Sequence, residues 1–267
     1  MRRSACLLSC ILLFSCFFKR PLPEWDIQKV AAIFEQNQAM GTFVVYDAKT
    51  DYLLMFNETR AHQAFYPAST FKIANSLIAL KTKAVYDEDE VFYQYEGYKD
   101  FDMEEWENDA SLRSGIKVSH VPAFQELARR IGLQNMREQL DVLDYGNREV
   151  GNNVENFWLE GPLKISAVQQ VYFLAALAQG TLPYPEEVQE AVRDICLLEQ
   201  GKGWALYGKT GWATKEKDPG IGWFVGWVNK GRHIYSFALN IDMTHAEQDL
   251  PKRVQLAKES LHALEII

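Results

Sequence analysis

Ser69 and Lys72 are the two residues whose types and spacing most clearly suggest chemistry. They belong to the segment PASTFK at residues 67–72, which lies between a polar stretch and the apolar run at residues 73–80. If that run is a helix, Ser69 lies in its first turn and Lys72, three residues later, shares its face. A helix N-terminus offers free backbone N–H groups and the positive end of the dipole. The pair therefore suggests acyl transfer by a serine nucleophile with a nearby amine base.

The same residues also fit a helix cap and a solvated lysine, because Ser-x-x-Lys occurs by chance in many proteins. Three further short motifs follow in order: Ser119-His-Val, Tyr145-Gly-Asn and Lys209-Thr-Gly. Each one alone fits a cap, a turn or a strand end. Their joint presence in this order favours a shared catalytic role.

Other catalytic arrangements find little support in the sequence. The histidines are His62, His120, His233, His245 and His262. They lack metal-ligand spacing and no His-Glu-x-x-His motif occurs, so a zinc site is not expected. There is no Gly-x-Ser-x-Gly, which argues against an α/β-hydrolase. Adjacency alone does not make His120 and Ser119 a triad, and we expect His120 on the surface or lining a cleft.

The composition is that of an acidic globular protein of 267 residues. Hydrophobic residues make up 48% and charged residues 24%, which suits one sizeable domain or two intimate lobes. The net charge of −8 argues against nucleic acid or an anionic membrane surface as a partner. The tryptophans are therefore expected in the core and in cleft walls.

Residues 1–20 are predicted to be an export signal rather than part of the fold. Arg2 and Arg3 precede an apolar run at residues 5–18, and Leu13-Phe-Ser-Cys16 resembles a bacterial lipobox with Cys16 as the lipidated residue. An uncleaved anchor is the alternative, although about 14 apolar residues is short for a membrane span. We expect a periplasmic protein, tethered to the membrane if Cys16 carries lipid. Only Cys196 then remains, so no intrachain disulfide is expected.

The elements that must position the motifs predict an α+β fold. Helices are predicted at residues 27–34, 73–80, 121–131, 136–142, 166–178, 185–198 and 251–264. Strands are predicted at residues 41–46, 52–56, 204–210, 221–229 and 233–241. The aromatic and acidic residues 85–112 are expected to form an ordered, irregular connection. A central antiparallel sheet completed by both chain ends, flanked by helices and by a helical lobe, follows from this order.

With these motifs and elements, residues 25–267 resemble the class D serine β-lactamases, the oxacillinases. Besides the motifs above, the resemblance is carried by FWLEGPLKIS at residues 157–166, IGWFVGWV at 221–228 and LPKR at 250–253. Tyr145-Gly-Asn and Trp158-Leu-Glu-Gly are more specific to this class than Ser-x-x-Lys. The resemblance implies a serine β-lactamase/transpeptidase-like fold, an α/β sandwich with a second lobe, over residues 21–267.

The resemblance implies hydrolysis of β-lactam antibiotics such as penicillins through an acyl-enzyme on Ser69. In this class the Ser-x-x-Lys lysine is carboxylated by CO2, so Lys72 would carry a carbamate that acts as general base in both acylation and deacylation. CO2 adds only to a neutral amine, and an apolar pocket lowers a lysine pKa. The indole N–H of Trp158 would donate to the carbamate. The residues expected to form the pocket are Phe71, Val121, Phe124, Trp158 and Leu159. No other cofactor and no metal are implied.

The same resemblance gives roles to the other motif residues. The backbone N–H groups of Ser69 and Trp212 would form the oxyanion hole. Ser119 would pass a proton to the lactam nitrogen with Lys209 close to it. Lys209 and Arg253 would meet the substrate carboxylate, for which a guanidinium offers paired donors. The substrate-binding residues implied are Thr210, Gly211, Arg253, Val121 and Leu159.

Two other functions stay open at this point. A penicillin-binding D,D-peptidase shares Ser-x-x-Lys and Lys-Thr-Gly but deacylates very slowly, and Tyr145-Gly-Asn and Trp158 speak against it. A β-lactam sensor domain of a membrane transducer stays acylated, but a transducer needs several spans and an effector. We expect a monomer or homodimer. The loops at residues 93–107 and 214–219, with the departures from the family pattern at His120 and Trp212, are expected to set the range of substrates.

Overall fold

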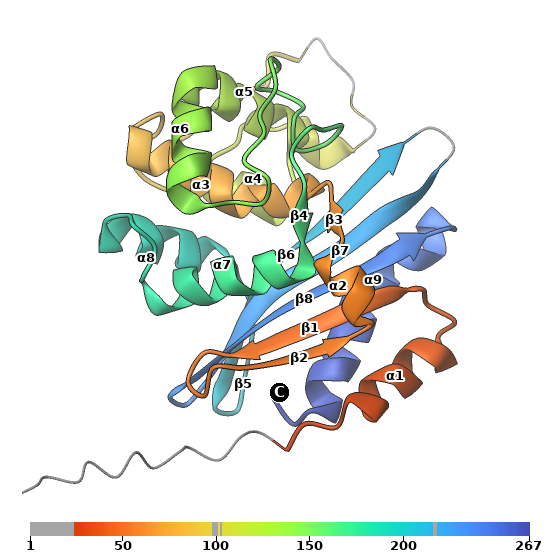
Figure 1. Cartoon of the computed structure of the whole chain (residues 1–267). Coiled ribbons are helices and arrows are strands. Elements are labelled where there is room, and N and C mark those ends of the chain that lie inside the picture. Colours follow the sequence, from red (N-terminus) through yellow and green to blue (C-terminus); the bar gives the residue numbers. More distant parts are fainter. Residues whose placement is uncertain (1–23, 98–100, 102, 216–217) are drawn as a thin grey trace, which may run out of the picture.

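The computed structural model describes residues 24–97, 101, 103–215 and 218–267 and has an antiparallel sheet at its centre (Figure 1). The six strands of this sheet are β1 (Gly41–Asp47), β2 (Tyr52–Phe56), β5 (Leu197–Gly201), β6 (Trp204–Lys215), β7 (Asp218–Lys230) and β8 (His233–Met243). Their order is β2-β1-β8-β7-β6-β5, so the first hairpin of the chain pairs with its last strand. The predicted sheet, completed by both chain ends, is confirmed.

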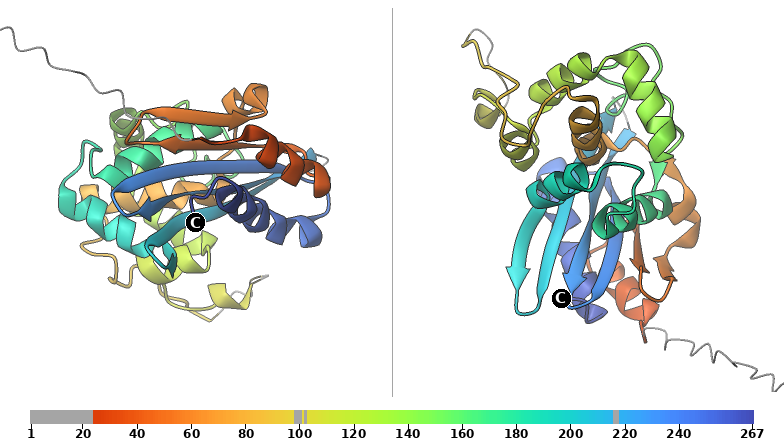
Figure 2. Two further views of the ribbon diagram at one scale, coloured as in Figure 1. Left: turned by 90° about the horizontal axis from the view of Figure 1, so that it is seen from below. Right: turned by 90° about the vertical axis from the view of Figure 1, so that its left-hand side faces the viewer.

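Helices cover both faces of the sheet (Figures 1 and 2). One face packs against α7 (Ala167–Gln179), where the Ser236 hydroxyl of β8 donates to the Val171 carbonyl at 2.7 Å. The opposite face packs against α1 (Ile27–Gln36) and α9 (Ala246–Ala263). Because strand side chains alternate between the two faces, a separate apolar core lies on each side of the sheet.

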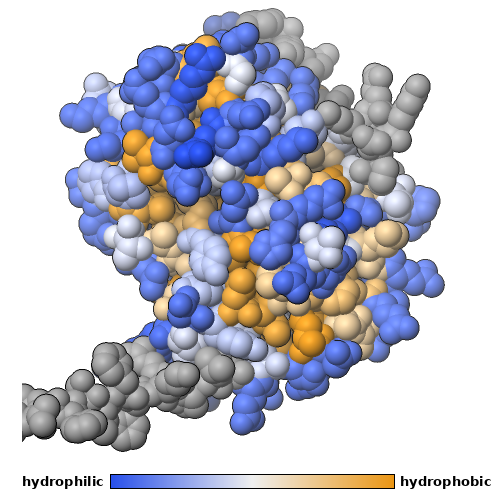
Figure 3. Space-filling model, in the orientation of Figure 1, coloured by the Kyte–Doolittle hydropathy of each residue, from blue (hydrophilic) through white to orange (hydrophobic). Residues whose placement is uncertain are grey.

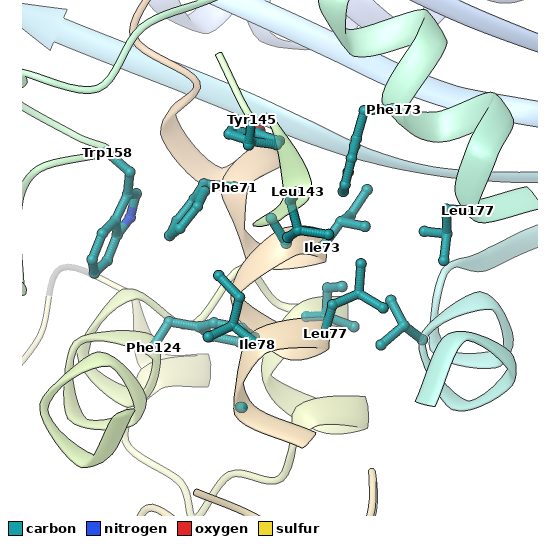
Figure 4. Close-up of a cluster of buried hydrophobic side chains, with 14 of the residues drawn as sticks. Phe71, Ile73, Leu77, Ile78, Phe124, Leu143, Tyr145, Trp158, Phe173 and Leu177 are labelled. Carbon is teal, nitrogen blue, oxygen red and sulfur yellow. The ribbon is translucent and has the colours of Figure 1, made fainter. Parts of the chain in front are cut away.

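The middle of the chain forms the predicted helical lobe beside the sheet. Its helices are α3 (Lys72–Thr82), α4 (Leu112–Lys117), α5 (Val121–Ile131), α6 (Leu133–Leu143) and α8 (Glu186–Ile195). Helix α3 runs through the centre of the lobe and is buried from Lys72 to Leu80. Figure 4 shows apolar side chains on all sides of it, whereas Figure 3 shows a mainly hydrophilic outer surface over this lobe. The lobe therefore has its own core, with α3 as its axis.

Four short elements were not predicted from the sequence. They are α2 (Glu58–His62), the paired strands β3 (Ala64–Phe65) and β4 (Ile165–Ser166), and the 3-10 turn η1 (Ala68–Phe71). Such short elements have too few residues to show a hydrophobic period. Among the described residues of 85–111, the connection is mainly irregular, as expected, with one 3-10 turn, η2 (Glu104–Trp106).

The predicted helix at residues 185–198 is wrong at its C-terminal end. Helix α8 ends at Ile195, and residues 197–201 form β5, which pairs with β6 at the sheet edge. The apolar residues there continue a helical pattern, but β6 satisfies their backbone groups, so a tertiary contact decides the structure. Other bounds differ by a few residues, and α9 begins at Ala246 instead of Pro251.

Some predictions concern residues outside those described. The expected export signal at residues 1–20, with Cys16, is among them. Within the described ranges, no helix is long and apolar enough to cross a membrane. Cys196, the one cysteine in residues 24–267, is a buried free thiol.

Candidate active site

The nucleophile candidate Ser69 lies in the tight turn η1 rather than in the following helix, which begins at Lys72. Ala68 has a left-handed φ of 49°, unusual for a residue with a side chain. Its N–H donates to the carbonyl of Trp158 at 2.9 Å. The indole N–H of Trp223, on β7, donates to the carbonyl of Tyr66 at 2.9 Å. Contacts from two distant segments thus hold the turn that presents Ser69.

A buried polar network supports the same turn from behind, and the sequence analysis missed it. Thr70 donates through Oγ1 to the carbonyl of Pro67 at 2.7 Å. Gln170, on α7, donates through Nε2 to Thr70 Oγ1 at 3.0 Å and lies 3.5 Å from the Tyr145 hydroxyl. The available signal was a glutamine on the apolar face of a predicted helix. Tyr145 therefore supports the Ser69 turn rather than standing in an ordinary loop.

The Lys72 side chain turns back toward the nucleophile. Its Nζ lies 2.9 Å from Ser69 Oγ and 5.1 Å from the ring centre of Phe124. The side chain is buried, with 1% of its surface exposed. Burial in apolar surroundings, reinforced by the charge of Lys209, holds the pKa of Lys72 well below its usual range. A buried neutral amine next to a serine hydroxyl can accept its proton.

The aromatic residues predicted for the pocket, Phe71, Phe124 and Trp158, lie on one side of α3 (Figure 4), and the Phe124 ring lies over the Lys72 amine. Trp158 is fully buried and stacks on Phe71 with ring centres 5.5 Å apart. Its Nε1 has no hydrogen-bond partner among the described residues. A buried N–H without an acceptor costs free energy, so this donor suits an anion formed beside it. Leu159 follows Trp158 and packs half-buried against the same core.

Ser119 and Lys209 form a second serine–lysine pair. Lys209, on β6, donates through Nζ to Ser119 Oγ at 2.9 Å and to the Thr210 carbonyl at 3.1 Å. Ser119 lies between α4 and α5 with a left-handed φ of 57°. Burial and the nearby charge of Arg253 lower the pKa of Lys209 to about 8. The structure therefore brings together residues that are 90 positions apart in the chain.

Strand β6 passes directly beside the Ser69 turn. A methyl group on Gly211 would lie 3.0 Å from the carbonyl oxygen of Pro67, so only glycine allows this approach without a shift. Trp212, the next residue, is 38% exposed. Arg253, on α9, donates through Nη1 to the Gly211 carbonyl at 2.7 Å. Burial lowers the pKa of its guanidinium to about 10.

The two residues that follow Ser119, His120 and Val121, differ in how deeply they are buried. Val121 begins α5 and is half-buried. The expectation that His120 lies on the surface or lines a cleft is wrong, because only 1% of its surface is exposed. Its ring caps α5 and packs between aromatic residues, which a sequence pattern does not show.

Across the described residues, no group of three or more His, Cys, Asp and Glu side chains is placed to hold a metal ion.

The sheet, the helical lobe and the Ser69–Lys72 pair at their boundary define a serine acyl-transfer protein of the penicillin-binding type. The family model of the penicillin-binding protein transpeptidase domain matches residues 41–262. β-Lactamase OXA-5 of Pseudomonas aeruginosa is 39% identical over 88% of this chain and 87% of its own length. β-Lactamase OXA-48 of Klebsiella pneumoniae is 38% identical over 97% of this chain and 98% of its own.

Solved structures give the same result. FUS-1 (OXA-85), a class D β-lactamase from Fusobacterium nucleatum subsp. polymorphum, is similar with a TM-score of 0.87 at 48% identity. The similarity covers 90% of this chain and 98% of that one. A class D β-lactamase from Nostoc matches with a TM-score of 0.85 at 35% identity. The chain therefore belongs to the class D β-lactamase family.

Proposed function

We propose that this protein hydrolyses the amide bond of β-lactam antibiotics through an acyl-enzyme on Ser69. The observation that carries the proposal is the 2.9 Å distance between Lys72 Nζ and Ser69 Oγ in a buried, apolar pocket. The relatives named as β-lactamases supply the substrate class.

In acylation, Ser69 Oγ attacks the lactam carbonyl carbon while its proton passes to the base at Lys72. The C–N bond of the ring then breaks and the lactam nitrogen needs a proton. Ser119 is suited to deliver it, because its hydroxyl accepts a hydrogen bond from Lys209 at 2.9 Å. The product of this step is an ester between Ser69 and the opened substrate.

Deacylation requires a base that can activate water, and we propose that Lys72 is carboxylated by CO2 in the active enzyme. The low pKa of the buried amine favours this modification, because CO2 reacts with neutral amines. When present, the carbamate would supply the general base for the deacylating water. The N–H of Trp158, which has no acceptor among the described residues, would donate to this anion.

Cationic groups are available for the substrate carboxylate. Lys209 and Arg253 lie on neighbouring elements, and the charge of Arg253 lowers the pKa of Lys209. An anion bound between them would relieve this repulsion. The backbone N–H groups of Ser69 and Trp212 are proposed as the oxyanion hole. Thr210, Val121 and Leu159 are proposed to contact the remainder of the substrate. We further propose export to the periplasm through residues 1–20.

The test is benzylpenicillin turnover by the purified protein with and without bicarbonate, after removal of CO2 at low pH. Repeated turnover that bicarbonate restores supports a β-lactamase working through carboxylated Lys72. A single burst that leaves a stable Ser69 adduct, unchanged by bicarbonate, would instead indicate a sensor or a penicillin-binding protein.

A further inference from the structure

His120 stands between the proton-relay candidate Ser119 and the first residue of α5, yet its side chain points into the protein. Its Nδ1 accepts a hydrogen bond from the backbone N–H of Ala123 at 3.1 Å. It thereby caps α5, whose first turn would otherwise leave that donor unpaired. Its Nε2 lies 3.3 Å from the carbonyl oxygen of Asn108.

These two contacts fix the protonation of the ring. An Nδ1 that accepts from a backbone N–H carries no proton, and an Nε2 that faces a carbonyl must carry one. The ring is therefore neutral, with its proton on Nε2. Burial also lowers the pKa of His120. In this form the His120 ring accepts from the free N–H of Ala123 on α5 and donates to the carbonyl of Asn108.

The ring also joins the 104–108 segment to the turn that carries Ser119. The indole of Trp106 stacks nearly parallel on His120, at 24° and with ring centres 6.2 Å apart. The Trp106 N–H donates to the carbonyl of Val118 at 3.3 Å. Val118 and His120, which flank Ser119 in the chain, thus both contact the 104–108 segment. Ser119 itself accepts a hydrogen bond from Lys209.

We propose that His120 is a positioning residue that performs two separable tasks. Through Nδ1 it sets the start of α5 and with it the placement of Ser119. Through Nε2 and its ring face it holds the 104–108 segment against the Ser119 turn. The kinetic part of this proposal rests on the proposed β-lactamase function.

Two substitutions separate the tasks. His120→Asn keeps an acceptor at the position of Nδ1 but loses the ring and the contact with Asn108. His120→Phe keeps a ring against Trp106 but leaves the N–H of Ala123 without its cap. Amide hydrogen exchange of the full-length protein measures both effects without any substrate. We expect at least tenfold faster exchange in residues 104–108 for His120→Asn, and in the first turn of α5 for His120→Phe.

Kinetics give the second readout, with kcat calculated from the concentration of enzyme that can form an acyl adduct. For His120→Asn, which keeps the cap of α5, we expect kcat for benzylpenicillin within about threefold of wild type. For His120→Phe, which removes the cap next to Ser119, we expect kcat to fall at least tenfold with KM within about threefold of wild type. Identical exchange patterns in the two variants, or an equal loss of kcat in both, would overturn the proposal. A wild-type protein without turnover would contradict the proposed function alone, since the exchange test stands apart from it.

Discussion

At the scale of single residues, the site is a set of basic side chains taken out of water. Lys72 and Lys209 are both buried, and each has a lowered pKa. Desolvation is the largest cause in both, and the repulsion of a neighbouring cation adds to it. Protonating such a cluster without nearby anions is costly, which supports the proposed carbamate at Lys72 and the proposed binding of a substrate carboxylate near Lys209.

The indole N–H of Trp158 should matter for deacylation more than for acylation. Trp158→Phe keeps an aromatic ring on Phe71 but removes the donor that finds no acceptor in the described part of the chain. We expect deacylation to fall about 10²-fold, the lower end of a typical general-base contribution, with acylation reduced far less. Stopped-flow kinetics and mass spectrometry of the Ser69 adduct measure the two rates.

Trp227 on β7 provides the matched control, because its indole N–H is also buried and has no partner within the described ranges. Its ring stacks on Tyr207, within the sheet. Trp227→Phe should leave both steps unchanged. Equal loss of acylation and deacylation in Trp158→Phe would contradict the carbamate-holding role.

At the scale of elements, the site depends on how closely β6 approaches the turn η1. Gly211 lies in contact distance of the backbone of Pro67, and its carbonyl accepts from Arg253. Lys209, two residues earlier on the same strand, reaches Ser119. Strand β6 therefore aligns Ser119, the turn that carries Ser69 and the guanidinium of Arg253. A displacement of β6 would affect all three.

Gly211→Ala tests this alignment. The added methyl must displace either β6 or the turn, because the Pro67 carbonyl is backbone and cannot rotate away. We expect a loss of about 1–3 kcal/mol in the free energy of unfolding, typical of overpacking, and a fall in kcat/KM of at least tenfold. Gly203→Ala is the control, since Gly203 has a φ of 82° and no atoms near the added methyl. It should lower stability while kcat/KM stays near wild type, and similar kcat/KM losses in both variants would exclude the alignment role.

The sequence could predict elements with a clear period and motifs with a fixed order. The sheet hairpins, α5 and the approach of Lys72 to Ser69 follow from such local patterns. It could not predict the strand at residues 197–201 or the support that Gln170 gives to the Ser69 turn. Pairing with β6 and the hydrogen bond to Thr70 are contacts between distant parts of the chain. The environment of His120 could not be predicted for the same reason, since it comes from Tyr93 and Asn108 as well as from its own helix.

At the scale of the whole molecule, the site lies where the sheet and the helical lobe meet (Figure 1). The lobe contributes Lys72 from the first turn of α3 and Ser119 from the link between α4 and α5, while β6 contributes Lys209. Because α3 is also the axis of the lobe core, the Lys72 amine is buried together with the residues that stabilise the fold. The proposed catalytic role of Lys72 and the stability of the fold are therefore expected to be opposed.

Lys72→Met should stabilise the protein while abolishing turnover. In the unfolded chain Lys72 binds a proton at every pH below its ordinary pKa of 10.5, whereas the folded protein disfavours that proton. The unfolded state thus binds more protons, so wild-type stability decreases as pH falls through this range. Methionine fills a similar volume but binds no proton. The Tm of Lys72→Met should therefore exceed that of wild type by a margin that grows as pH decreases from about 9 to 6. We expect this margin to reach at least 2 °C, or about 1 kcal/mol for a domain of this size. Thermal unfolding in CO2-depleted buffer measures it, with exposed Lys202→Met as the control that should follow wild type. Parallel curves for Lys72→Met and wild type across this pH range would mean that burial of the amine does not cost stability.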